Sequence, residues 1–174
     1  DVSTDKILVN SVGKLSFFSK DGVFEKEIKL ENPFTNTIIP LGNHYIAKSY
    51  TNTKGNIFQT LNVFDKNFKK IKEIARVKHV FQQGKGLKVL AAQPQQRVYN
   101  DKLYVAWKND FEIRVFDKNL KELPTINYKL ERQKVSDDDK KKILTYLKTS
   151  RDTKAFFEML KPITFPTYYP AILG

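Results

Sequence analysis

The sequence predicts an all-β fold assembled from repeated hairpins. Three segments share one pattern: Phe-Phe-Ser-Lys-Asp-Gly at residues 17–22, Val-Phe-Asp-Lys-Asn-Phe at 63–68 and Val-Phe-Asp-Lys-Asn-Leu at 115–120. In each copy a run of strand-forming residues ends in a polar turn, and a second run follows at 23–30, 69–75 and 121–128. Copies of one hairpin at a regular spacing indicate stacked supersecondary units.

The spacing of the copies sets the size of the unit. The turns begin at Ser19, Asp65 and Asp117, which are 46 and 52 residues apart, close to the roughly 40–50 residues of one four-stranded propeller blade. Each interval holds further predicted strands, at residues 37–41, 44–49 and 57–65 and at 87–92, 103–107 and 111–117. We therefore expect a partial β-propeller of about three four-stranded blades.

The turn residues have a structural explanation. Asp65 and Asp117 are expected to bond to nearby backbone groups, and Asn67 and Asn119 to accept the left-handed backbone conformation. The pairs Gly42-Asn43 and Asn100-Asp101 mark the other turns.

The chain is expected to be a single domain, residues 1–174. Residues 6–10 begin it where a second strand would stand, so the first blade is expected to lack its innermost strand. Ser136 is expected to begin a helix whose first turn carries Asp137, Asp138 and Asp139, and Pro162 to end a second short helix. The expected parts are an incomplete first blade at 5–31, a second at 34–76, a third at 86–130, a helical hairpin insertion at 136–161 and the start of a next blade at 163–174.

The motifs resemble those of bacterial six-bladed β-propeller proteins of the NHL-related or TolB-like group. Blades of that group typically end in Ile-x-Val-Phe-Asp-x-Asn, which matches residues 113–119 and, less fully, 61–67. The Tyr-Pro-Ala-Ile element after a charged helical insertion is matched at 169–172. The resemblance implies that this chain holds about half of a ring. Either the missing remainder of the propeller or a second copy in a homodimer would then cover the open blade faces.

Composition narrows the classes of function. The chain has 31 Lys and Arg against 19 Asp and Glu, a formal net charge of +12, and no cysteine. This charge would attract nucleic acid, anionic lipid or acidic polysaccharide, although interspersed charges are also typical of a solvated surface in a protein from an AT-rich genome. Disulfides and thiolate catalysis are excluded. No apolar run is long enough to span a membrane. An extracytoplasmic location, periplasmic or cell-surface, is preferred to a cytoplasmic one.

The sequence contains no recognisable catalytic or cofactor motif. His44 and His79 lack the spacing of a helical metal pair, and Gly84-Lys85-Gly86 lacks the rest of a nucleotide-binding loop. The alternation around Trp107 favours a core position for that side chain. We therefore predict no catalytic residue, no metal and no cofactor.

A binding role is the main functional hypothesis. Residues 76–88 link two predicted blades and interleave basic with aromatic side chains, although a solvated connection with one anchored Phe is the simpler interpretation. A non-enzymatic scaffold that recognises a protein, peptide or glycan is the first hypothesis. A nucleic-acid-binding propeller is the alternative, and a propeller lyase or lactone hydrolase the third. The candidate binding residues are Arg76, Lys78, His79, Phe81, Lys85, Lys88, Gln95 and Arg97.

Overall fold

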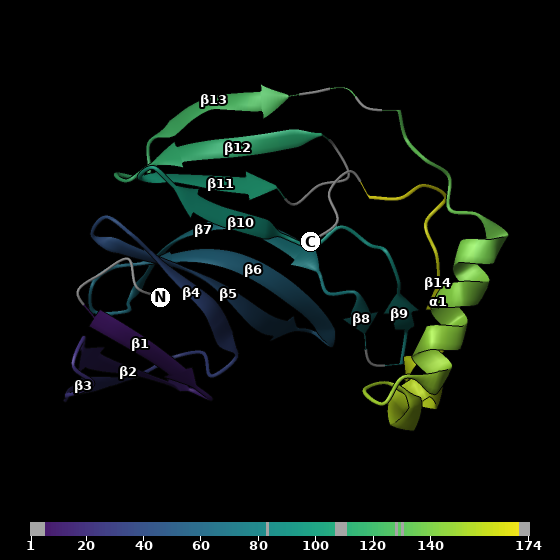
Figure 1. Cartoon of the computed structure of the whole chain (residues 1–174), viewed down its shortest axis with the longest axis horizontal. Helices are drawn as coiled ribbons and strands as arrows, with labels where there is room; N and C mark the ends of the chain where they lie inside the picture. Colours follow the sequence, from purple (N-terminus) through teal and green to yellow (C-terminus); the bar gives the residue numbers. More distant parts are fainter. Residues whose placement is uncertain (1–5, 83, 107–110, 128, 130, 171–174) are drawn as a thin grey trace.

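The computed structural model of the chain describes residues 6–82, 84–106, 111–127, 129 and 131–170. It confirms the all-β class, with four sheets and a short helical segment (Figure 1). The N-terminal sheet contains β1 (Lys6–Ser11), β2 (Lys14–Ser19) and β3 (Phe24–Lys29). The central sheet contains β4 (Thr35–Leu41), β5 (His44–Thr53), β6 (Asn56–Phe64) and β7 (Lys70–Lys78).

Two further sheets complete the fold. The third sheet contains β10 (Gln95–Tyr99), β11 (Lys102–Ala106), β12 (Glu112–Asp117) and β13 (Glu122–Asn127). The small sheet contains β8 (Phe81–Gln82), β9 (Gly86–Lys88) and β14 (Ile163–Thr164). The helices are α1 (Asp137–Thr149) and the 3-10 helix η1 (Lys154–Leu160). Neither helix is long and apolar enough to span a membrane, and the described residues form no other helix.

The three hairpins predicted from the repeat occupy equivalent places in three separate sheets. They join β2 to β3, β6 to β7 and β12 to β13, each time antiparallel. The N-terminal sheet has three strands in the described part of the chain, whereas the central and third sheets have four each. That the first unit lacks its innermost strand stays a prediction.

The three repeat turns have the same hydrogen bonds, but the left-handed residue is not the one predicted. The N–H of Phe68 donates to the carbonyl of Asp65, that of Leu120 to Asp117 and that of Gly22 to Ser19. The positive φ angles fall on Gly22 (80°), Phe68 (62°) and Leu120 (66°), and not on the asparagines. Such a turn followed by a left-handed residue is a common hairpin connection. The prediction for Asn67 and Asn119 was therefore wrong by one position.

Asp117 fastens its turn through one carboxylate oxygen. Its Oδ1 accepts from the N–H of Asn119 and from the N–H of Lys121, both at 2.9 Å. Changing Asp117 to Ala is expected to lower the free energy of unfolding by about 1 kcal/mol, because both N–H groups lose this acceptor. Asp117→Asn keeps an acceptor oxygen at this place. Its free energy of unfolding, measured by urea denaturation, should therefore fall by less than that of Asp117→Ala. Equal losses in the two variants would contradict this role.

Two hydrophobic cores lie between the three larger sheets. Strand β6 is buried on both faces, so that Leu61 and Val63 pack toward the third sheet while Phe64 packs toward the N-terminal sheet. Phe116 and Leu15 are fully buried on the facing sheets. Each sheet therefore buries its apolar side chains against its neighbour along the chain. Figure 1 shows the N-terminal, central and third sheets following one another in that order.

The strand predicted at residues 87–92 was wrong. Residues 86–88 form β9 in the small sheet, and the first strand of the third sheet begins at Gln95. The N–H groups of Leu87 and Val89 donate to the carbonyls of Pro162 and Thr164, both at 3.0 Å. Because these N–H groups bond to the C-terminal segment, residues 86–92 do not join the third sheet. That sheet spans residues 95–127, whereas the third blade was predicted at 86–130.

The C-terminal segment was also placed incorrectly where the structure describes it. It was expected to open a next blade, but β14 pairs in parallel with β9 of this same chain. Lys134 and Tyr168 form a further antiparallel bridge. Residues 171–174 lie outside the described part, as do Trp107 and Tyr128.

The helical insertion confirms the predicted start at Ser136. The Ser136 hydroxyl accepts from the Asp139 N–H while the Asp139 carboxylate accepts from the Ser136 N–H, a capping box. The Ser136 hydroxyl also donates to the Asp139 carboxylate at 2.6 Å, and this hydrogen bond, together with the one from the Ser136 N–H, lowers the pKa of Asp139. The second helix is a 3-10 helix, and Phe156 is exposed on it.

Candidate functional site

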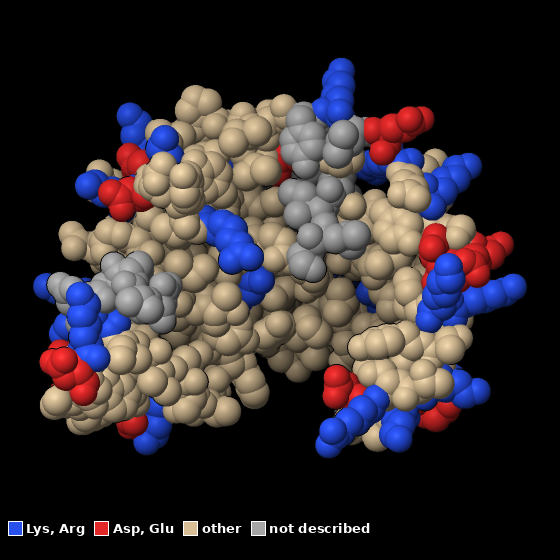
Figure 2. Space-filling model, viewed as in Figure 1, with Lys and Arg blue, Asp and Glu red and all other residues tan. Residues whose placement is uncertain are grey.

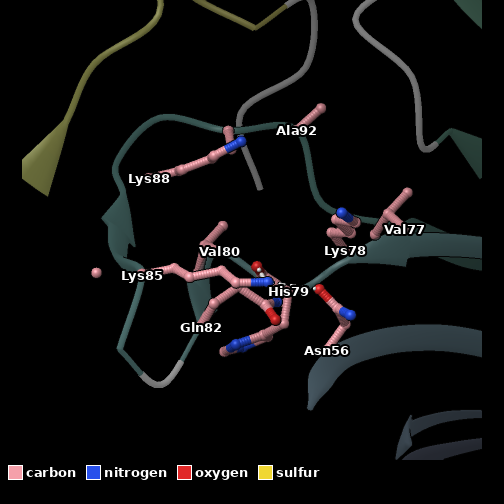
Figure 3. A pocket seen from close by; sticks show the side chains of 11 residues that line it. Asn56, Val77, Lys78, His79, Val80, Gln82, Lys85, Lys88 and Ala92 are labelled. Carbon is pink, nitrogen blue, oxygen red and sulfur yellow. Dashed lines mark hydrogen bonds between the residues drawn. The ribbon is translucent and has the colours of Figure 1, made fainter. Parts of the chain in front are cut away.

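A basic pocket of about 420 Å³ lies between the end of the central sheet and the small sheet (Figure 3). Its size is within the usual range for small-ligand sites. The end of β7, the β7–β8 connection and β9 supply most of its wall, and the start of β6 supplies one residue. The lining residues are Asn56, Val77, Lys78, His79, Val80, Gln82, Lys85, Gly86, Lys88, Ala91 and Ala92.

Three lysines give this basic pocket its charge. In Figure 3, Lys85 and Lys88 extend from the small sheet toward the side where Lys78 and Asn56 lie. The Nζ of Lys85 donates to Oδ1 of Asn56 at 3.1 Å. No carboxylate is among the described residues that line the pocket. The positive charge is therefore not neutralised locally, and it favours a ligand with an anionic group.

The remaining wall of the basic pocket is partly apolar. Val77, Val80, Ala91 and Ala92 line it beside the lysines. Ligand sites typically combine such apolar lining with a few polar groups that fix orientation. The arrangement therefore suits an anionic group carried on a larger, partly apolar molecule better than a free, fully hydrated ion.

Gln82 attaches the small sheet to the central sheet. Its side-chain Oε1 accepts from the Ile57 N–H at 2.8 Å, and its Nε2 donates to the Ile57 carbonyl at 2.7 Å. The same Nε2 is 2.9 Å from the His79 carbonyl. The buried amide thus substitutes for a strand neighbour of β6, and it fixes the wall of the basic pocket.

Replacing Gln82 by Leu is expected to cost about 2–4 kcal/mol of stability, because three backbone groups lose a partner in a partly buried place. Hydrogen exchange of the Ile57 amide should become faster, and urea denaturation gives the free energy. Gln95→Leu is a matched control, since Gln95 is half-buried and its side chain makes no hydrogen bond to the described residues. If both variants behaved alike, Gln82 would not have this anchoring role.

His79 is held by its surroundings. Its ring is edge-on to Tyr50 with centroids 5.1 Å apart, and its Nδ1 is 3.1 Å from the Phe81 carbonyl oxygen. These contacts hold the His79 ring in the wall of the basic pocket and give it a structural role. The described residues contain no group of three or more His, Cys, Asp or Glu side chains that could hold a metal ion.

The structure brings together Lys78, His79, Lys85 and Lys88 from the predicted binding residues. The other four lie outside the basic pocket. Arg76 is engaged by Glu73, at 2.7 Å and 3.0 Å, and these hydrogen bonds lower the pKa of Glu73. Phe81 belongs to β8, and Gln95 and Arg97 belong to β10.

Asn56 was not predicted, because it comes from the β5–β6 hairpin, far in sequence from residues 76–88. The anchoring role of Gln82 was not predicted either, although Gln82 lies within residues 76–88. No local signal marked either residue, because their roles depend on which strands meet in space.

Comparisons with known proteins leave the family open. No protein-family model and no curated protein matches the chain. Among solved structures, a protein of unknown function from Bacteroides caccae is similar at 13% sequence identity with a TM-score of 0.25. The match covers 78% of this chain and 47% of that one, so the chain spans about half the length of that protein.

Proposed function

We propose that this chain is a non-enzymatic binding module whose basic pocket takes an acidic group of a protein, peptide or glycan partner. The observation that carries the proposal is the convergence of Lys78, Lys85 and Lys88 around a pocket whose described lining contains no carboxylate. Lysines without local counter-charges raise the local concentration of anionic partners and speed their association.

The same geometry favours an acidic partner over a nucleic acid. Single-strand binders stack bases on aromatic side chains, and the candidate for that role was Phe81. Phe81 does not line the basic pocket, and among its described lining residues only His79 has an aromatic ring, which packs against Tyr50.

We also propose that the three larger sheets are consecutive blades of a β-propeller. Their succession along the chain and their two inter-sheet cores support this architecture. Apolar side chains are exposed on the outer sheets, including Ile7 and Val9 on β1 and Tyr99 and Ile126 at the other end. Further blades of the same ring would cover them, and a second copy of this chain is the alternative. Sedimentation analysis tests the homodimer, because a chain that stays monomeric in solution would contradict it. The extracytoplasmic location stays a prediction.

Titration calorimetry with a short poly-glutamate peptide tests the binding role. We expect salt-sensitive binding to the wild-type chain, and at least about tenfold weaker binding when Lys78 and Lys88 are both changed to Gln. The matched control changes Lys66 and Lys118 to Gln, two exposed turn lysines, and so keeps the same net charge. Equal binding by both double variants would overturn the proposal. A single-stranded oligonucleotide that bound more tightly than the peptide would favour the nucleic-acid alternative.

A further inference from the structure

A second pocket, of about 370 Å³, lies between the end of β1 and the start of β4, where the N-terminal and central sheets meet. Residues 10–12 and 33–36, together with Tyr50, line this neutral pocket, and none of them is charged or lines the basic pocket. In Figure 2 many charged side chains lie toward the edges of the molecule, and the surface where β1 ends and β4 begins is tan. Because this lining offers no charge, it suits an uncharged ligand.

Two of the lining residues have exposed apolar side chains. Val12, in the turn between β1 and β2, is 86% exposed, and Phe34, directly before β4, is 64% exposed. A Cβ at Gly13 would lie 3.3 Å from the Cβ of Pro33, so this turn and the segment that leads into β4 are in contact. Exposed apolar side chains that gather in one place mark interaction sites, whereas single ones do not.

The backbone of Phe34 is fixed although its ring is exposed. The Phe34 N–H donates to Oδ1 of Asn32 at 2.9 Å, and the Phe34 carbonyl accepts from the Tyr50 N–H at 3.3 Å. Nδ2 of Asn32 donates in turn to the Tyr50 carbonyl at 2.9 Å. These hydrogen bonds tie the segment before β4 to β5. A ligand that packs on the Phe34 ring therefore meets a preorganised surface, which lowers the entropic cost of binding.

The backbone groups of residues 34 and 35 already have partners. The Thr35 N–H donates to the Asn32 carbonyl at 3.1 Å, and the Thr35 carbonyl accepts from Nδ2 of Asn10 at 3.1 Å. Phe34 uses its own N–H and carbonyl as described above. A peptide that binds by strand addition needs free N–H and carbonyl groups at a sheet edge. This part of the neutral pocket does not offer them.

Uncharged polar groups remain available at the neutral pocket. Oδ1 of Asn10 and the hydroxyl of Ser11 make no hydrogen bond to any residue that the structure describes. The amide oxygen accepts a hydrogen bond, and the hydroxyl both donates and accepts. The hydroxyls of a sugar also donate and accept, so they can pair with both groups.

The backbone beside the neutral pocket is strained. Thr37 has a φ angle of 50°, and the pairing of β4 with β5 shifts in register between Asn36 and Ile39. A β-branched residue rarely adopts this left-handed conformation. Strained residues and β-bulges are common beside binding sites, and Asn36 is one of the lining residues.

We propose that the neutral pocket binds a neutral saccharide, with an apolar face of a sugar ring packed on Phe34 and its hydroxyls hydrogen-bonded to Asn10 and Ser11. A sugar ring has apolar C–H groups on its faces and hydroxyls around its edge. It therefore matches a lining that combines exposed apolar side chains with a few uncharged polar groups. This site does not depend on the proposed binding of an acidic partner, because the two pockets share no lining residue.

NMR titration of the complete chain with cellotetraose, an uncharged saccharide, tests this site. We expect cellotetraose to shift the ring signals of Phe34 and the amide signals of Asn10 and Ser11, and to leave the lysine signals of the basic pocket unchanged. Because the ligand is neutral, added salt should not change its affinity. The salt-sensitive binding expected for poly-glutamate distinguishes the basic pocket from this site, so either proposal can fail without the other.

Variants of Phe34 test the contact with the sugar ring. Phe34→Ala should weaken cellotetraose binding at least about tenfold, whereas Phe34→Tyr keeps an aromatic ring and should bind within about twofold of the wild-type chain. Phe156→Ala is the matched control, since Phe156 is also exposed and does not line the neutral pocket. Its affinity should equal that of the wild-type chain.

Three outcomes would overturn the proposal of a saccharide site. The first is that cellotetraose leaves the Phe34 signals of the wild-type chain unchanged. The second is that a tetra-alanine peptide shifts these signals and cellotetraose does not, which would favour a peptide ligand. The third is that Phe34→Ala binds cellotetraose as tightly as the wild-type chain. The first two are decided without any variant, so a folding defect cannot obscure them.

Discussion

Changing Gly86 to Ala is expected to detach the C-terminal segment from the small sheet. A Cβ at this position would lie 2.0 Å from the carbonyl oxygen of Pro162 and 2.6 Å from its nitrogen, both backbone atoms. The φ angle of Gly86 is 81°, which an alanine adopts only at a cost. The backbone of Pro162 would have to move, and the left-handed φ of an alanine adds a further cost. We therefore expect the free energy of unfolding to fall by about 2–5 kcal/mol.

Gly84 provides the control for this prediction. Its φ is 71°, and apart from its chain neighbours no described residue has an atom within 4 Å of the place where its Cβ would be. Gly84→Ala should therefore lower the free energy of unfolding by about 1–2 kcal/mol, the cost of the left-handed backbone alone, because its Cβ meets no described backbone atom of another segment. Hydrogen exchange of the Leu87 and Val89 amides reports the β9–β14 pairing, and it should accelerate in Gly86→Ala alone. Protection that survives in that variant would show that the segment does not depend on this close approach.

Changing Phe116 to Ala is expected to cost about 3–5 kcal/mol, measured by urea denaturation. Phe116 is fully buried in the core between the central and third sheets, where Leu61 and Leu103 also pack. Truncation would leave a cavity at an interface that β-strand hydrogen bonds do not bridge, since the two sheets are separate. The packing of side chains is then the main attraction between them.

Phe156 is the matched residue for this comparison. It is 55% exposed on η1, and its change to Ala should cost less than about 1 kcal/mol. Similar losses in Phe116→Ala and Phe156→Ala would mean that the inter-sheet core does not hold the sheets together.

The repeated hairpins could be predicted because they depend on local chemistry. Turn residues such as Asp65 and Asp117 bond within a few residues of themselves, so their effect is visible in a short window of sequence. The left-handed position escaped prediction because Phe68 has no intrinsic preference for it. Burial of the Phe68 side chain in the core accompanies this conformation, and burial is a property of the assembled sheets.

The small sheet could not be predicted, because its partners are far apart along the chain. Leu87 was assigned to a strand of the third sheet from its apolar neighbours, yet its N–H bonds to Pro162. The basic pocket was predictable in part, since Lys78, Lys85 and Lys88 lie in one short segment. Asn56 joins them only through the pairing of β6 with β7 and the link from Ile57 to Gln82.

The most direct test of the proposed binding role follows the lysine side-chain NMR signals of the wild-type chain while a poly-glutamate peptide is added. Our account predicts that Lys78, Lys85 and Lys88 respond first and with a common affinity, and that added salt weakens the response. Shifts spread evenly over the lysines of the three larger sheets, with no preference for these three, would contradict it.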